Sequence, residues 1–137
     1  ASSEKANETV KAETIYTLED NGLSQEWYGN VWMNPPYSQP LIDDFSRRLV
    51  NEYFTNQINQ ACVLVNNATE TTWFQRMLNV CSSICFISGR IKFIDENGEP
   101  SGAPLQGQCV LYLGKNKEVF HKFFNSFGIV LCQTPVK

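Results

Sequence analysis

The sequence lacks the features of a membrane, secreted or metal-binding protein. Its 137 residues contain no apolar run long enough to cross a bilayer, and no signal-peptide pattern opens the chain. Histidine occurs once, at position 121, and the five cysteines form no Cys-x-x-Cys pair, which argues against a zinc site. The odd number of cysteines also argues against a disulfide framework. We therefore expect a soluble, cytoplasmic protein with reduced cysteines and no metal ion.

An excess of positive charge is also absent. Lys and Arg number 11 against 14 Asp and Glu, which gives a net charge of -3. Domains that bind nucleic acids usually carry a basic footprint, so this balance counts against a broad nucleic-acid surface. It still allows a local basic patch, for which Arg47, Arg48 and Arg90 are candidates, although a solvated surface charge is the simpler interpretation of each.

Apolar runs and helical spacings alternate along the chain, which has a length typical of one domain over residues 1–137. Strands are predicted at residues 31–33, 61–65, 84–87 with a continuation over 90–93, 109–113 and 128–132. Helices are predicted at residues 3–11, 40–54, 69–78 and 118–127. Such alternation favours an α/β fold with a mixed, mostly parallel sheet.

The hydrophobic core should draw on aromatic residues and cysteines. Trp73 and Phe74 lie on the apolar stripe of a predicted helix, and Trp27 and Trp32 flank the strand at residues 31–33. We expect all four aromatic side chains to pack in the core, although Trp27 or Trp32 could instead form a wall of the cofactor or base pocket. Four of the five cysteines occur in apolar runs and are expected to be buried as small hydrophobic residues.

The tetrapeptide Asn34-Pro35-Pro36-Tyr37 follows the strand at residues 31–33. Neither proline has an N–H group to donate, so the strand must end at Asn34. The motif should then lie at the carboxyl edge of the sheet, where open α/β folds bind their ligands. The tetrapeptide alone is also ordinary turn chemistry, but its place between a strand and a helix favours a site over a plain loop.

These four residues suit chemistry at a planar amino group. The exocyclic amine of adenine is a poor nucleophile because its lone pair is delocalised into the ring. The side-chain oxygen of Asn34 and the backbone carbonyl of Pro35 could accept hydrogen bonds from both N–H groups and so localise that lone pair. The rigid double proline would hold the acceptors in place, and Tyr37 offers a face on which the base stacks. A base within a duplex would have to be extruded first.

Several motifs, in the same order, resemble the phage-type DNA N6-adenine methyltransferases. They are Tyr16-Thr17-Leu18-Glu19-Asp20-Asn21-Gly22-Leu23 with Trp27, residues 31–38, residues 63–65 with 71–74, and residues 87–93. The resemblance implies a Rossmann-like methyltransferase fold, S-adenosylmethionine as the cofactor, and adenine in DNA as the substrate. It implies that Asn34, Pro35 and Tyr37 hold the target base with Pro36 as support. It also implies that Asp20 and Asn34 approach the cofactor.

Asp20 and Arg90, which lie outside the tetrapeptide, each have an alternative interpretation. Asp20 precedes Asn-Gly, so it is equally suited to forming a turn. Arg90 follows Gly89 at a break in the predicted strand, where its guanidinium could contact a DNA phosphate or form a surface ion pair.

The resemblance is incomplete at the start of the chain. The family has an Asp-containing strand and turn that begins the cofactor site, and Ala1-Ser2-Ser3 resembles only the end of that turn. We therefore expect the first strand of the fold to be absent and S-adenosylmethionine to bind weakly or not at all to this chain alone. Three functions stay open: a DNA adenine methyltransferase, an N-methyltransferase of RNA or of protein amides, and an inert methyltransferase-derived module that binds DNA or protein.

Overall fold

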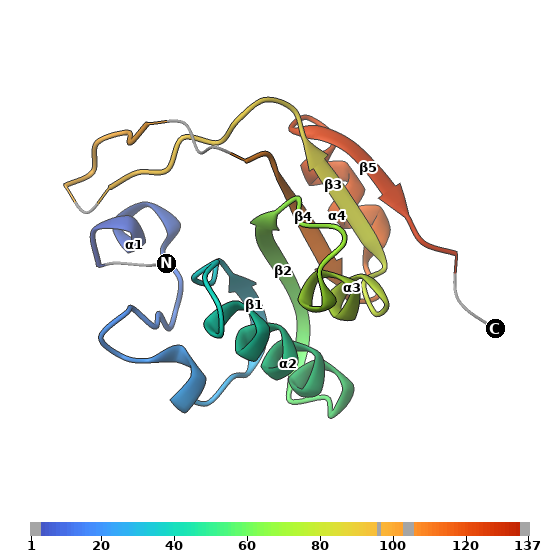
Figure 1. Ribbon diagram of the computed structural model, residues 1–137, viewed down its shortest axis with the longest axis horizontal. Helices are drawn as coiled ribbons and strands as arrows, with labels where there is room; N and C mark the ends of the chain where they lie inside the picture. Colours follow the sequence, from blue (N-terminus) through green and yellow to red (C-terminus); the bar gives the residue numbers. More distant parts are fainter. Residues whose placement is uncertain (1–3, 96, 103–105, 135–137) are drawn as a thin grey trace.

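The computed structural model describes residues 4–95, 97–102 and 106–134 (Figure 1). Its elements are α1 (Glu4–Val10), a 3-10 turn (Gly22–Ser24), β1 (Gly29–Met33), α2 (Leu41–Phe54), β2 (Ile58–Asn66), α3 (Thr72–Leu78), β3 (Ser83–Ile87), β4 (Gln108–Leu113), α4 (Lys117–Phe124) and β5 (Gly128–Cys132). The predicted strands and helices are confirmed to within a few residues, apart from the continuation over residues 90–93. That segment is not a strand, because Gly89 adopts a φ of 76° and turns the chain out of the sheet.

The five strands form one sheet in the order β1-β2-β4-β3-β5. Only β1 and β2 pair in parallel, and the three other pairings are antiparallel. The prediction of a mostly parallel sheet is therefore wrong, because β4 inserts between β2 and β3 and runs against both. The pairings still give β1, β2 and β3 a common direction. Their carboxyl ends and the beginning of β4 lie at the same edge, which we call the carboxyl edge.

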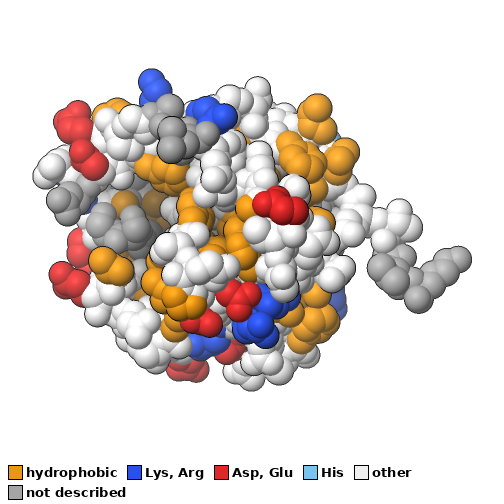
Figure 2. Space-filling model, viewed as in Figure 1, with side chains coloured by type: hydrophobic (Ala, Val, Ile, Leu, Met, Phe, Trp, Pro, Cys, Tyr) orange, Lys and Arg blue, Asp and Glu red, His pale blue; other side chains and the backbone are white. Residues whose placement is uncertain are grey.

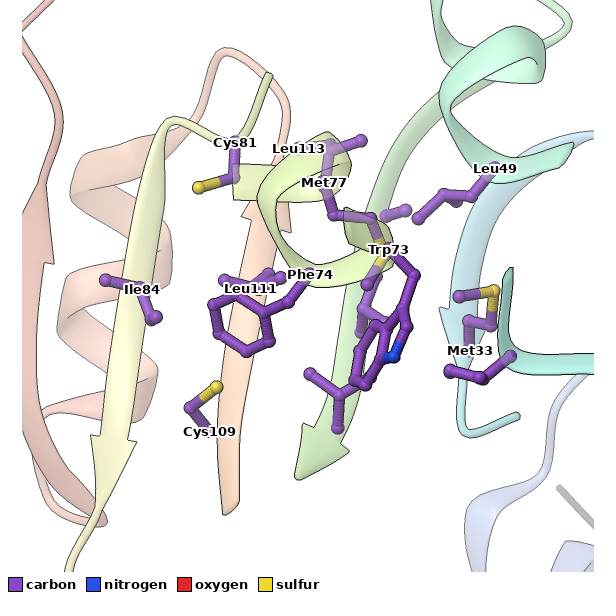
Figure 3. Close-up of a cluster of buried hydrophobic side chains, with 14 of the residues drawn as sticks. Met33, Leu49, Trp73, Phe74, Met77, Cys81, Ile84, Cys109, Leu111 and Leu113 are labelled. Atoms are coloured by element: carbon purple, nitrogen blue, oxygen red, sulfur yellow. The ribbon is translucent and has the colours of Figure 1, made fainter. Parts of the chain in front are cut away.

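Helices cover both faces of this sheet, α2 and α3 on one side and α4 on the other (Figure 1). The larger core lies beneath α2 and α3, where Phe74 packs beside Leu111 (Figure 3). Beneath α4 the ring of Phe120 stacks between Tyr112 and Phe124, with ring centroids 5.1 and 4.5 Å away. None of the helices in the described ranges combines the length and hydropathy needed to cross a membrane.

The aromatic residues divide between the core and the surface. Trp27, Trp73 and Phe74 are buried as predicted, but Trp32 is 48% exposed and the prediction for it is wrong. The reason is the position of Trp32 on β1, an edge strand, whereas α4 contacts β3 and β5 at the other end of the sheet.

The cysteines largely follow their prediction. Cys81, Cys85 and Cys109 are buried, Cys62 is half-buried and Cys132 is exposed, and all five are free thiols. Burial raises the pKa of Cys62 to about 11 and that of Cys109 to about 12, so these thiols stay protonated and behave as small apolar groups.

The core predicts a clear contrast between two leucines. Leu111 is fully buried against Phe74, whereas Leu18 is 87% exposed. Leu111→Ala should lower the free energy of unfolding by about 2–5 kcal/mol, because it removes buried methyl groups and leaves a cavity. Leu18→Ala should change it by less than about 0.5 kcal/mol. Urea denaturation of both variants measures this difference, and equal effects would contradict the packing described.

Candidate active site

The predicted tetrapeptide leaves the sheet at the carboxyl edge. Met33, the last residue of β1, pairs with Val63 of β2, and α2 begins at Leu41. Within the motif, Asn34 and Pro36 are exposed, Pro35 is buried and Tyr37 is half-buried. The sequence therefore predicted both the end of the strand and the edge at which the motif lies.

The hydroxyl of Tyr37 joins the motif to the neighbouring strand. It donates to the side-chain oxygen of Asn34 at 2.9 Å and to the carbonyl of Leu64 at 3.0 Å, so one O–H group is shared between two acceptors. Leu64 lies one residue beyond Val63, where the pairing with β1 has ended. The ring of Tyr37 also packs against the larger core. Desolvation raises the pKa of the Tyr37 phenol well above its usual range, so it stays a neutral donor.

Two neighbouring oxygens are available for a further ligand. The Asn34 side-chain oxygen has two lone pairs, of which Tyr37 occupies one. Within the described residues, the carbonyl of Pro35 accepts no hydrogen bond. Because Pro35 and Pro36 restrict the backbone between them, these two acceptors are held in place before a ligand arrives.

Arg48 of α2 fixes the segment that precedes β1. Its guanidinium donates to the carbonyls of Leu23 and Gln25, pairs with Glu52 at 2.7 Å, and lies 4.9 Å from the centre of the Trp27 ring. Trp27 in turn donates from its indole nitrogen to the carbonyl of Gly22 at 2.8 Å. The interpretation of Arg48 as a solvated surface charge is therefore wrong. Its partners lie 23 and 25 residues away in the chain, which local pattern cannot show.

Comparison with known proteins identifies the family of this chain. The family model for DNA N-6-adenine-methyltransferase (Dam) matches residues 1–130. This chain belongs to the DNA N-6-adenine-methyltransferase family. A DNA N-6-adenine-methyltransferase of Haemophilus phage HP1 is 35% identical over 66% of this chain and 52% of its own length. One of Escherichia phage T1 is 28% identical over 82% of this chain and 53% of its own length.

The chain therefore spans about half the length of these methyltransferase relatives. No solved structure matches the chain.

Asp20, a predicted cofactor residue of this methyltransferase family, has a clear local role. One of its carboxylate oxygens accepts from the backbone N–H of Thr17 at 2.7 Å and from the Thr17 hydroxyl at 2.9 Å. These hydrogen bonds, the backbone one first, lower the pKa of the exposed Asp20 carboxyl, so it is ionised at neutral pH. The other oxygen accepts no hydrogen bond among the described residues. The turn-forming interpretation is confirmed, and the cofactor role stays a prediction.

Arg90, the predicted phosphate contact, lies just past the carboxyl end of β3 and is exposed. Because β3 is three positions from β1 in the sheet, Arg90 shares the carboxyl edge with the motif but not its immediate surroundings. Acidic and basic side chains are scattered over the face drawn in Figure 2, without a continuous basic stripe. A role for Arg90 in binding DNA stays a prediction.

A further pair of side chains at the carboxyl edge was not predicted. Gln108, the first residue of β4, donates from its side-chain nitrogen to the side-chain oxygen of Asn66, the last residue of β2, at 3.2 Å. In the sequence, Asn66 directly follows the apolar run at residues 61–65, a position expected at the end of a strand. Gln108 gave a weaker signal, a single polar residue before the apolar run at residues 109–113.

The raised pKa of Tyr37 predicts a pH dependence of stability. An unfolded phenol loses its proton near pH 10, whereas the folded one keeps it to higher pH. The unfolded state therefore binds fewer protons as the pH rises through 10, and the stability that this group contributes is present below that pH and lost above it. From about pH 9 to about pH 11 the free energy of unfolding should fall more steeply in the native protein than in Tyr37→Phe. Parallel curves from denaturant titrations at each pH would contradict the burial of this hydroxyl.

Arg48 and Arg47 form a matched pair for testing the support of the motif. Arg48→Lys should lower the free energy of unfolding by about 1.5–3 kcal/mol, because a lysine cannot reproduce the guanidinium fork that reaches two carbonyls and Glu52. Arg47 is 64% exposed and pairs only with Asp43 in the described structure, so Arg47→Lys should have an effect below about 0.5 kcal/mol. Thermal unfolding of both variants compares them, and a larger effect at Arg47 would refute this assignment.

Proposed function

We propose that this chain carries the target-base site of an enzyme that transfers a methyl group from S-adenosylmethionine to N6 of adenine in DNA. The observation that supports this most directly is the pair of neighbouring acceptors, the Asn34 side chain and the Pro35 carbonyl, at the end of an edge strand. Membership of the DNA N-6-adenine-methyltransferase family supports the same reaction.

The proposed chemistry depends on hydrogen bonding to both N–H groups of the adenine amine. Asn34 accepts from one with its free lone pair, and Pro35 accepts from the other with its carbonyl. This localises the nitrogen lone pair, which can then form a bond to the methyl carbon while the sulfur–methyl bond of the donor breaks. N6 also loses one proton, which passes to solvent because the neutral amide of Asn34 is not a base. Fixed acceptors stabilise the positive charge that develops on nitrogen.

The residues present fit a sulfonium donor at its adenosine end. Asp20 has a carboxylate oxygen that accepts no hydrogen bond among the described residues and could accept one from a hydroxyl or amino group of the donor. The exposed Asn34 would lie beside the reacting nitrogen. When bound, S-adenosylmethionine supplies an electrophilic methyl group on a good leaving group. We propose that Asp20 and Asn34 hold it in this way, within a Rossmann-like methyltransferase fold. The common direction of β1, β2 and β3 and the helices on both faces support that fold.

DNA binding is proposed to rest on local contacts. An extruded adenine would stack on the exposed part of the Tyr37 ring, a contact worth about 1–3 kcal/mol. Arg90 at the same edge would contact a phosphate of the backbone. The net charge of -3 fits such limited contacts better than a broad electrostatic surface.

A methyl-acceptor assay with the full-length protein tests this function. The protein should transfer labelled methyl groups to DNA and not to RNA or protein, and Asn34→Ala should lower kcat by about 10²–10³-fold, because one fixed acceptor is lost. The matched control is Asn30→Ala, since Asn30 is an exposed asparagine at the other end of β1. It should retain full activity. Undiminished methylation of adenine by Asn34→Ala would refute the proposed mechanism, and methylation of RNA or protein alone would refute the substrate.

A further inference from the structure

The side-chain amides of Asn66 and Gln108, which pair at the carboxyl edge, differ in burial and in hydrogen bonding. Gln108 is only 2% exposed, and its buried side-chain oxygen has no hydrogen-bond partner among the residues that the structure describes. Buried polar atoms almost always have partners, so an unsatisfied one calls for a functional or structural reason. The paired Asn66 is only half-buried and therefore open to a ligand.

Gln108 sets the direction of the Asn66 amide. Its side-chain nitrogen donates to the Asn66 oxygen at 3.2 Å, which leaves the NH2 group of Asn66 as the part that faces away from Gln108. The reverse arrangement would leave the buried Gln108 nitrogen without an acceptor, and orphaned N–H groups are rarer than under-satisfied oxygens. Within the described structure the Asn66 NH2 group makes no hydrogen bond.

The strand register brings Asn66 to the same stretch of the carboxyl edge as the motif. Asn34 leaves β1 level with Leu64, whose carbonyl accepts the Tyr37 hydroxyl, and Asn66 follows two residues later on β2. Two residues along a strand cover about 6–7 Å. Since β1 and β2 are adjacent, a planar base held by its amino group at Asn34 and extending toward β2 would come within reach of Asn66.

We propose that Asn66 donates a hydrogen bond to a ring nitrogen of the target adenine, and that Gln108 is the positioning residue that presents this donor. The inference rests on the proposed function. Adenine carries a hydrogen-bond acceptor on each side of its amino group, N1 and N7. The two protein acceptors, Asn34 and Pro35, would bind the amino group, and the donor Asn66 would bind one of these ring nitrogens. Guanine has an oxygen where adenine has its amino group, so it cannot satisfy Asn34 and Pro35.

Base analogues in the DNA test this contact in the full-length protein. With ordinary DNA, Asn66→Ala and Gln108→Met should each lower kcat/KM by about 10- to 100-fold, the effect of one good base contact. DNA that carries 1-deazaadenine or 7-deazaadenine at the target lacks one ring acceptor. One of these analogues should impair the native enzyme by a similar factor and cause no further loss in either variant.

Controls separate this role from a merely structural one. Asn67→Ala changes the exposed neighbouring asparagine and should leave both kcat/KM and the effect of the analogues as in the native protein. Gln108→Met removes an unsatisfied buried oxygen and has a similar volume, so its melting temperature should not fall. The inference would be overturned if the variants lost activity relative to the native protein by the same factor on ordinary DNA and on both analogue DNAs. It would also be overturned if Asn66→Ala lost no activity on ordinary DNA. A native protein that methylates no DNA would instead refute the proposed function, and this inference with it.

Discussion

The hydroxyl of Tyr37 lies between the side-chain oxygen of Asn34 and the carbonyl of Leu64, and the candidate site depends on this shared hydrogen bond. It joins the end of β1 to β2 at the point where the two strands stop pairing. The prolines between Asn34 and Tyr37 restrict the backbone but do not by themselves fix it relative to the sheet. The Tyr37 hydroxyl fixes this backbone relative to the sheet, and burial keeps the hydroxyl protonated. The acceptors that we assign to the target amine are thus fixed in the free protein, as electrostatic catalysis requires.

Much of this site could be predicted because its signals are local. Two prolines after an apolar run end a strand wherever they occur, so the edge position of Asn34 followed from the sequence. The burial of Trp73 and Phe74 followed from helical periodicity in the same way. Asp20 was equally suited to a turn and to a cofactor contact, and its hydrogen bonds to Thr17 establish the first without testing the second.

The features that could not be predicted depend on distant parts of the chain. Strand and helix alternate as in a parallel sheet, but the insertion of β4 between β2 and β3 is a matter of pairing that periodicity does not encode. The same insertion brings Gln108 to Asn66 across 42 residues. Trp32 is exposed because α4 covers the other end of the sheet, which no property of its own strand indicates.

A crystal structure of the full-length protein with duplex DNA and an unreactive analogue of the methyl donor tests the central claim most directly. The quantity to measure is the distance from N6 of the extruded adenine to the Asn34 side-chain oxygen and to the Pro35 carbonyl. Our account predicts that both distances are about 2.7–3.2 Å, with the Tyr37 hydroxyl still bonded to Leu64. An adenine amine bound elsewhere, with the Asn34 amide turned away from it, would contradict the account.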